Sequence, residues 1–281
     1  MKTENSLDLI LHPPKRLGHL GIIADLLRSM GVLDLIDEVC GSDSRMKVSH
    51  GECVRVLVLG VFAGEHGLWR LTDRLDPYDM ATLTGDPGVD LREFHDVRLG
   101  RMLDAVWDAG PERLLSALSL RVVEWARLDL GTLHFDTTTL SFYGAYEEDL
   151  DDSWTPELDA VLDPGMVPQR AARSESSVDG DGRAAPVVTH GYAKNGRHDL
   201  KQILFGLVVA GDGAVPLYGR AMDGNASDIT AAAAFLDYLH TQIPDPYGQV
   251  FVADSKGWAP PSLECVRRHR LRLLSRLPRS T

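Results

Sequence analysis

The sequence lacks the features that would place it in a membrane or in an oxidising compartment. Its 281 residues include three cysteines, Cys40, Cys53 and Cys265, which lie far apart without a Cys-x-x-Cys pair or a nearby pair of histidines. This spacing argues against a disulfide framework and against a structural zinc site. No apolar run approaches the ~20 residues of a membrane-spanning helix. Residues 1–11 carry acids where a secretory signal would be apolar. We therefore expect a cytoplasmic protein with no membrane partner.

Several catalytic motifs are also absent. The sequence has no GxxxxGK[ST] loop to cradle a phosphate, no HExxH zinc-protease motif and no GxSxG nucleophile elbow. P-loop nucleotide hydrolysis, zinc proteolysis and serine hydrolysis therefore have no support. Aspartyl-phosphate enzymes are only faintly resembled, because Thr138 stands two places after Asp136, where those enzymes have a second aspartate.

The net charge of −12 is unevenly distributed, so it does not exclude nucleic acid as a partner. Residues 131–186 hold 3 basic and 12 acidic residues, whereas residues 187–281 hold 11 basic and 8 acidic residues. The acidity is thus concentrated in the middle of the chain. Residues 147–186 are also rich in Ser, Gly and Pro and poor in large apolar groups, which predicts a mobile insertion.

Helical periodicity marks the first part of the chain. Apolar residues recur at intervals of three and four over residues 20–27. Ser49 and Glu52 form a capping box in front of an apolar run, and Pro111 is placed to begin a further helix. The pattern predicts an all-α N-terminal domain over residues 1–130.

Beyond residue 130 the pattern becomes that of an α/β domain. Residues 132–143 are β-branched and aromatic with near alternation, which is typical of a strand. The other expected elements are a hairpin over residues 200–219, a helix over 229–240, a strand over 249–253, a helix over 260–270 and a strand over 271–277. This order predicts an α/β sheet with an antiparallel portion over residues 131–281.

Two aspartates fall on the expected strands. Asp136 lies within the first strand, on the face opposite to Leu133 and Phe135, and Asp254 ends a later strand. Two carboxylates on neighbouring strands repel each other unless a divalent cation lies between them. Mg²⁺ accepts one or two carboxylates together with water and phosphate oxygens. Such a pair could hold the metal for in-line attack on a phosphodiester. From spacing alone, the simpler interpretation that each aspartate ends or caps a strand is favoured.

Ordered motifs carry a family resemblance over most of the chain. The stretches LHFDTTTLSFYG, HGYAKNGRHDLKQILFGLVV, DGAVPLYGRAMDGNASD, VFVADSKGW and LLSRLP resemble, in order, the catalytic core of bacterial insertion-sequence DDE transposases of the IS-four-type family. HLGIIADLLRSMGVLDLID and DVRLGRMLDAVWDAG are similar to the helical domain that precedes this core in one branch. The resemblance implies a ribonuclease-H-like α/β catalytic core, incomplete at its end, preceded by an all-α N-terminal domain.

The resemblance also implies DNA transposition chemistry that depends on Mg²⁺ or Mn²⁺. Asp136 matches the first metal-binding acid of the family and Asp254 the second. In the family, water cleaves a phosphodiester, and the freed 3′-hydroxyl then attacks target DNA. Both steps are metal-assisted displacements at phosphorus. The implied partners are double-stranded DNA, at the transposon ends and at the target, and a second copy of the chain in a homodimer.

The third acid of the family, a glutamate on a later helix, has no match. The only acid after Asp254 is Glu264, ten residues on, and an exposed helical position explains it better. Because the sequence stops at Thr281, we expect a truncated core that cleaves DNA poorly on its own.

A basic and aromatic cluster precedes the expected hairpin, and it comprises His190, Tyr192, Lys194, Arg197, His198 and Lys201. These side chains could hold phosphates and stack on an unpaired base, or they could form a solvated strand entrance. The family motif favours DNA contact. Asn225 and Asp228 match a further family motif and could organise the site, although helix capping explains Asp228.

Three functional hypotheses remain open at this point. The first is a truncated DDE transposase, and the second is a non-catalytic DNA-binding or dimer-forming remnant that inhibits intact transposase. The third is a different metal-dependent nuclease that uses Asp136 and Asp254 together with a further residue that the sequence does not identify, for which Asp228 is a candidate. By resemblance, the N-terminal helices are expected to recognise the transposon end. The alternative is that they serve packing or dimerisation. Their basic residues Arg45, Lys47, Arg55, Arg70 and Arg74 are too sparse to decide.

Overall fold

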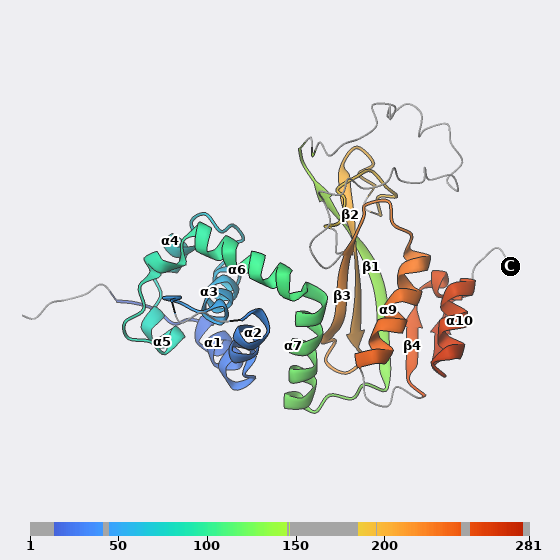
Figure 1. Cartoon of the computed structure of the whole chain (residues 1–281), viewed down its shortest axis with the longest axis horizontal. Coiled ribbons are helices and arrows are strands. Elements are labelled where there is room, and N and C mark those ends of the chain that lie inside the picture. Colours follow the sequence, from blue (N-terminus) through green and yellow to red (C-terminus); the bar gives the residue numbers. More distant parts are fainter. Residues whose placement is uncertain are drawn as a thin grey trace, which may run out of the picture. The chain divides into compact units, whose positions relative to one another are not determined.

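The computed structural model describes residues 14–41, 45–144, 146, 185–194, 196–242 and 248–277. The insertion expected over residues 147–186 lies outside the described residues, except for its last two. The chain divides into two compact units, Met1–Trp125 and Ala126–Thr281 (Figure 1).

Every element described in the first unit is helical. The elements are α1 (Leu20–Ser29), α2 (Val32–Cys40), α3 (His50–Phe62), α4 (Leu71–Leu75), α5 (Met80–Thr84), the 3-10 helix η1 (Leu91–Phe94), α6 (Asp96–Ala109) and α7 (Pro111–Ala126). The expected cap of α3 is confirmed, because the Ser49 side chain accepts a hydrogen bond of 3.1 Å from the Glu52 N–H. Among the helices that the structure describes, none has the length and apolar character needed to cross a membrane.

Helix α3 forms the centre of this unit and packs against α1, α2, α4 and α6. Its buried Val56 and Leu59 join the core with Leu20 of α1 and Leu71 of α4. The contact between α3 and α4 depends on a missing side chain, because a Cβ atom on Gly60 would lie 1.9 Å from Leu71 Cδ1. The two helices therefore touch where glycine leaves room.

The second unit is built on a five-stranded mixed sheet in the order β3-β2-β1-β4-β5. Its strands are β1 (Thr132–Phe142), β2 (Lys201–Ala210), β3 (Pro216–Met222), β4 (Val250–Ala253) and β5 (Arg272–Ser275), and its helical elements are α9 (Asp228–Gln242), η3 (Ser255–Trp258) and α10 (Pro260–Arg268). Strands β1, β2 and β3 pair antiparallel, whereas β4 pairs parallel with β1 and β5 parallel with β4. This mixed α/β arrangement is that of the ribonuclease-H-like fold.

The expected strands are confirmed, with shifted ends. The first strand ends at Phe142, one residue early, and β3 continues to Met222, three residues past the expected hairpin. The last strand covers only Arg272–Ser275 of the seven residues expected. Where a strand ends depends on which of its residues still pair with the neighbouring strand. The alternation of residues within one segment does not indicate this pairing.

Helix α9 lies against one face of the sheet and contacts α10 beside it (Figure 1). Its buried Phe235 stacks edge-on against Phe135 of β1, with ring centroids 5.2 Å apart, and against Tyr218 of β3 at 4.8 Å. Gly206 of β2 gives the ring its room, because a Cβ atom there would lie 2.6 Å from Phe235 Cζ. This aromatic contact fixes α9 on the central strands.

We predict that Gly60→Ala lowers the free energy of unfolding of the helical unit. The added methyl group meets the buried Leu71 side chain, and overpacking of this kind costs about 1–3 kcal/mol. Urea denaturation followed by circular dichroism measures the change.

Gly100→Ala is the matched control, because a Cβ atom on this α6 glycine has no atom within 4 Å. There the gain in helix propensity should stabilise the unit by about 0.5–1 kcal/mol. Equal stabilisation by both substitutions would contradict the close α3–α4 contact.

Candidate active site

The parallel pairing of β1 and β4 places the two predicted acids side by side. In the register of this pair, His134 lies opposite Val252. Continued two residues further, the same register sets Asp136 beside Asp254, just past the end of β4. Partners in a parallel pair share a face, and neighbouring strands lie about 4.8 Å apart. The two carboxylates therefore leave adjacent backbones on the same side of the sheet.

Both acids line one shallow hollow. The other described residues that line it are Phe135, Thr137, Ala232, Ala253 and Gly257. The hollow opens where β4 ends and β1 continues, at the carboxyl end of parallel strands, which is where open α/β sheets bind their ligands. Asp136 and Asp254 are both exposed to solvent there.

The backbone around Asp254 is held by the turn that follows it. The Asp254 carbonyl accepts hydrogen bonds from the Gly257 N–H at 3.0 Å and from the Ser275 hydroxyl at 2.5 Å. A Cβ atom on Gly257 would lie 2.9 Å from Ala253 Cβ, so the turn of η3 closes against β4 only because residue 257 is glycine. These contacts fix the backbone of Asp254 and thereby position the second acid.

On the β1 side, a lysine lies next to the first acid. The Thr137 N–H donates to Asp136 Oδ1 at 2.7 Å. Lys194 Nζ donates to the Thr137 carbonyl at 2.7 Å and to the Thr137 hydroxyl. Lys194 thus anchors its segment on β1, at the residue that follows Asp136.

The acid pair fits a hard divalent cation. Two exposed carboxylates supply oxygen ligands and leave room for water and phosphate oxygens, the combination that Mg²⁺ and Mn²⁺ accept. Among the described residues, no third acid lines the hollow. Glu264 lies on α10 with 77% of its side chain exposed, and its carboxylate is 4.0 Å from Arg268.

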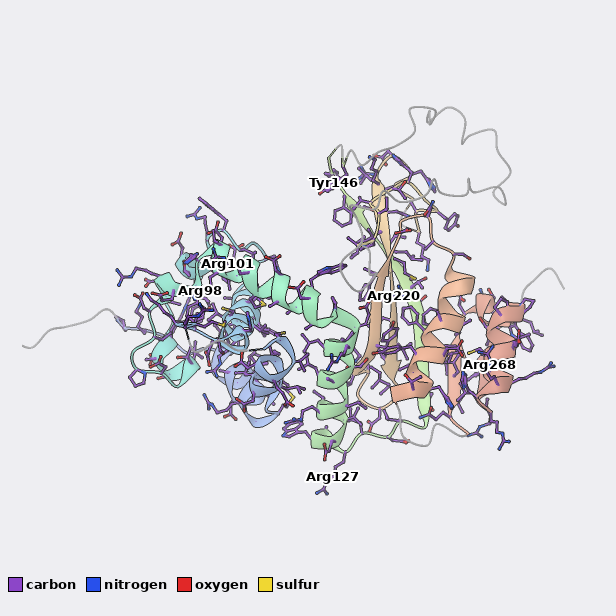
Figure 2. All side chains as sticks on the ribbon, in the orientation of Figure 1. Arg98, Arg101, Arg127, Tyr146, Arg220 and Arg268 are labelled. Atoms are coloured by element: carbon purple, nitrogen blue, oxygen red, sulfur yellow. The ribbon has the colours of Figure 1, made fainter. Side chains whose placement is uncertain are left out.

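The predicted DNA-binding residues extend from this hollow to the far end of β1 and β2. Lys201 pairs with Phe142 there, and its Nζ donates to the Tyr146 carbonyl at 2.8 Å. Tyr146 marks this end of the sheet in Figure 2. Tyr192 is 77% exposed, with its ring centroid 6.4 Å from that of His198. The cluster therefore presents an open aromatic face beside cations.

Arg197 is held in place by its neighbours. Its guanidinium makes two hydrogen bonds of 2.8 Å to the Asp199 carboxylate and one of 3.3 Å to the Tyr143 hydroxyl. The bidentate contact lowers the pKa of Asp199 to about 2. A DNA phosphate approaching Arg197 has to share the guanidinium with Asp199.

The two supporting residues lie between β3 and α9. Their segment meets the strand entrance at a close backbone approach, since a Cβ atom on Gly191 would lie 2.0 Å from the Gly224 carbonyl oxygen. Asn225 follows directly and is partly exposed. Asp228 is the first residue of α9, four residues before Ala232 in the hollow, and its side chain lies outside the described part of the structure.

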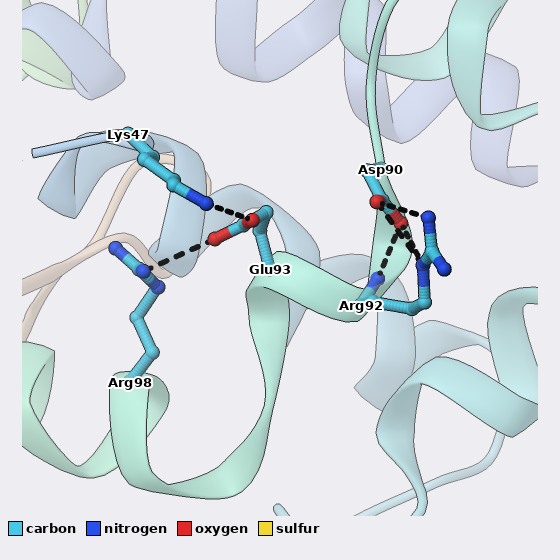
Figure 3. Close-up of polar contacts among 5 residues, drawn as sticks. All are labelled: Lys47, Asp90, Arg92, Glu93 and Arg98. Atoms are coloured by element: carbon cyan, nitrogen blue, oxygen red, sulfur yellow. Dashed lines mark hydrogen bonds and ion pairs between the residues drawn. The ribbon is translucent and has the colours of Figure 1, made fainter.

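Basic residues of the helical unit have partners within that unit. Lys47 Nζ lies 2.7 Å from Glu93 Oε1, and Arg98 contacts the other oxygen of this carboxylate at 3.1 Å (Figure 3). Three further pairs are Arg55 with Glu52 at 2.9 Å, Arg70 with Asp73 at 3.4 Å and Arg74 with the Ala63 carbonyl at 3.0 Å. These contacts favour a packing role for the charges, and recognition of a transposon end by this unit stays a prediction.

Sequence reasoning missed one cluster altogether. Asp237 of α9 lies against Cys265 of α10 and His269 at its end, and one ligand atom from each lies within 4.8 Å of the others. The signal in the sequence was the Cys-x-x-x-His spacing of residues 265 and 269, which share one helix face. The partner on α9 had no such signal.

A comparison with protein families finds one match in the first unit. A family described as "Domain of unknown function (DUF4277)" matches residues 13–120. A comparison with curated proteins finds no match.

Solved transposase structures are distantly similar in fold. The piggyBac transposase synaptic complex with hairpin DNA is 9% identical with a TM-score of 0.38, over 93% of this chain and 51% of that one. The Mos1 transposase paired-end complex with the left transposon end is 10% identical with a TM-score of 0.29, over 85% and 63%. This chain thus spans about half of the piggyBac chain and under two thirds of the Mos1 chain. With TM-scores this low, the fold assignment rests on the strand order and register.

Proposed function

We propose that this protein is a DNA transposase of the DDE class, from the IS-four-type family, in which Asp136 and Asp254 hold Mg²⁺ or Mn²⁺. The observation that carries the proposal is the parallel β1–β4 register, whose continuation brings Asp136 next to Asp254, together with the hollow that both residues line. Both residues are exposed to solvent, so neither acid belongs to the buried core.

The residues of the hollow have different roles in the proposed reaction. A divalent cation bound there supplies charge neutralisation at the phosphodiester and activates the attacking hydroxyl group. Asp136 and Asp254 bind and orient the cation from two adjacent strands. Lys194, held on Thr137, anchors the segment before β2 on β1. Asp136 and Asp254 are exposed to solvent at the hollow, so a phosphate of a DNA strand can approach a cation held there.

The DNA runs along the basic and aromatic cluster in this proposal. The exposed ring of Tyr192, with His198 next to it, offers a stacking surface for an unpaired base. Arg197 and Lys201 of the same cluster carry N–H donors for phosphates. Transposon ends and target DNA are the proposed ligands, and the active form is a homodimer that holds two ends.

A second candidate follows from the acids that line the hollow. Among the described residues, two acids line the hollow, whereas the transposase family that the sequence resembles uses three acids. The chain taken alone is then a weak nuclease, or it binds DNA without cleaving and inhibits an intact transposase. DNA binding is common to both candidates, and metal-dependent nicking separates them.

We predict that Asp136→Asn and Asp254→Asn each reduce Mg²⁺- or Mn²⁺-dependent nicking of supercoiled DNA by at least about 100-fold, the scale of losing one preorganised electrostatic contact. Each change removes a charged oxygen ligand without altering the size of the side chain. Gel analysis of nicked circles, with and without EDTA, measures the effect.

Asp212→Asn is the matched control, because this aspartate lies in the β2–β3 turn and accepts a hydrogen bond from the Asp129 N–H that asparagine preserves. Nicking that survives both active-site changes would refute the proposed metal pair. Absence of nicking in the unaltered chain, with DNA binding intact, would contradict the catalytic proposal and favour the non-catalytic DNA-binding alternative. An equal loss in Asp228→Ala would add this residue as a third metal-binding group.

We also predict that Arg197→Gln weakens DNA binding and lowers the salt dependence of the association constant by about one unit in the log–log slope. Arg92→Gln is the control, since Arg92 in the helical unit makes the same bidentate contact, to Asp90 (Figure 3). Fluorescence anisotropy with a duplex probe over a salt series gives both slopes. Equal slopes for the two variants would remove Arg197 from the DNA interface.

A further inference from the structure

The contact between α9 and α10 contains a polar cluster that the proposed DNA chemistry does not use. Cys265 is buried with 1% exposure, and the His269 side chain is 11% exposed. Asp237 Oδ1 is 3.2 Å from Cys265 Sγ and 2.5 Å from His269 Nε2. One carboxylate oxygen thus meets a thiol and an imidazole at the same point.

The sequence spacing of the cluster is that of paired metal ligands on facing helices. Cys265 and His269 are four residues apart, so they share one face of α10. Asp237 faces them from α9, and the ring of His240, one turn further on, lies 3.9 Å from the ring of His269. Sulfur, nitrogen and oxygen donors therefore converge from α9 and α10, and Asp237 and Cys265 are 28 residues apart in the sequence.

The types of ligand atom in the cluster determine which metal ion it can bind. Thiolate, imidazole and carboxylate ligands suit Zn²⁺, which binds them tetrahedrally at ~2.0–2.3 Å, whereas Mg²⁺ requires oxygen ligands throughout. Ligand atoms around such an ion lie roughly 3.3–3.8 Å apart, so Asp237 and His269 must separate by roughly 1 Å to admit it. A carboxylate and a thiolate together balance the charge of the ion.

We propose that Asp237, Cys265 and His269 bind a zinc ion that locks α10 onto α9. Arg268, at 3.1 Å from Asp237 Oδ1 and 3.2 Å from Oδ2, orients the carboxylate as an outer hydrogen-bond partner. The exposed side of Asp237 gives the ion its path inward, because 45% of this side chain is accessible. The expectation of no structural zinc site, drawn from the cysteine spacing, is replaced by this proposal.

The site is independent of the proposed transposition chemistry and serves the fold. Burial, with Asp237 next to it, raises the pKa of the Cys265 thiol to about 12. A buried thiol of this kind is a poor nucleophile, so the cluster is not suited to covalent or redox catalysis. When the metal binds, the thiol proton passes to solvent and the sulfur becomes a ligand.

Titration of the full chain with Co²⁺ tests the proposal, because a cysteine-ligated tetrahedral Co²⁺ ion gives a thiolate charge-transfer band and strong visible bands. We expect these bands to saturate at one ion per chain and to disappear on addition of Zn²⁺. Cys265→Ser should lose the charge-transfer band. Asp237→Asn, on the exposed side of the cluster, should weaken binding by more than the roughly 10–100-fold cost of losing an outer partner.

Cys53→Ala is the matched control, because Cys53 is an equally buried thiol in the helical unit, 1% exposed. It should keep the bands, as should the Asp136→Asn, Asp254→Asn double variant, which lacks the acid pair of the hollow. Circular dichroism establishes that each variant is folded. A full chain that gives no thiolate band at saturating Co²⁺, or a band that Cys265→Ser retains, would overturn the zinc site and leave a hydrogen-bonded cluster.

Discussion

The repulsion between two carboxylates on adjacent parallel strands is the constraint on which the functional part of this structure depends. Asp136 and Asp254 meet because β1 and β4 pair in parallel and β4 ends just before the second acid. Bringing two negative charges onto neighbouring strands is unfavourable in the absence of a cation. Exposure to water lowers that cost, and a divalent cation would remove it.

Most of the chain outside the acid pair serves to hold these two strands in register. Phe235 of α9 packs onto Phe135 of β1, and Gly206 leaves the space that the ring needs. On the other strand, the turn of η3 binds the Asp254 backbone through the Gly257 N–H. The zinc site proposed for α9 and α10 would act on the same framework, because α10 leads directly into β5, the partner of β4.

Much of the fold could be predicted from the sequence, because alternation and capping are local signals. The alternation over β1 correctly placed Leu133 in the core and Asp136 on the open face. The pairing of β1 with β4 was not accessible in this way, since it joins residues more than a hundred positions apart. The Asp237–Cys265 contact was missed for the same reason, because it also joins residues far apart in the sequence. The sequence likewise did not indicate that the Asp199 carboxylate binds Arg197.

The most direct test of the account is a crystal structure of the full chain soaked in Mn²⁺, with the ion located by its anomalous scattering. The account predicts a peak between the Asp136 and Asp254 carboxylates, with Lys194 still bonded to Thr137. Mn²⁺ bound elsewhere on the chain, with the two carboxylates turned apart and no peak between them, would contradict it.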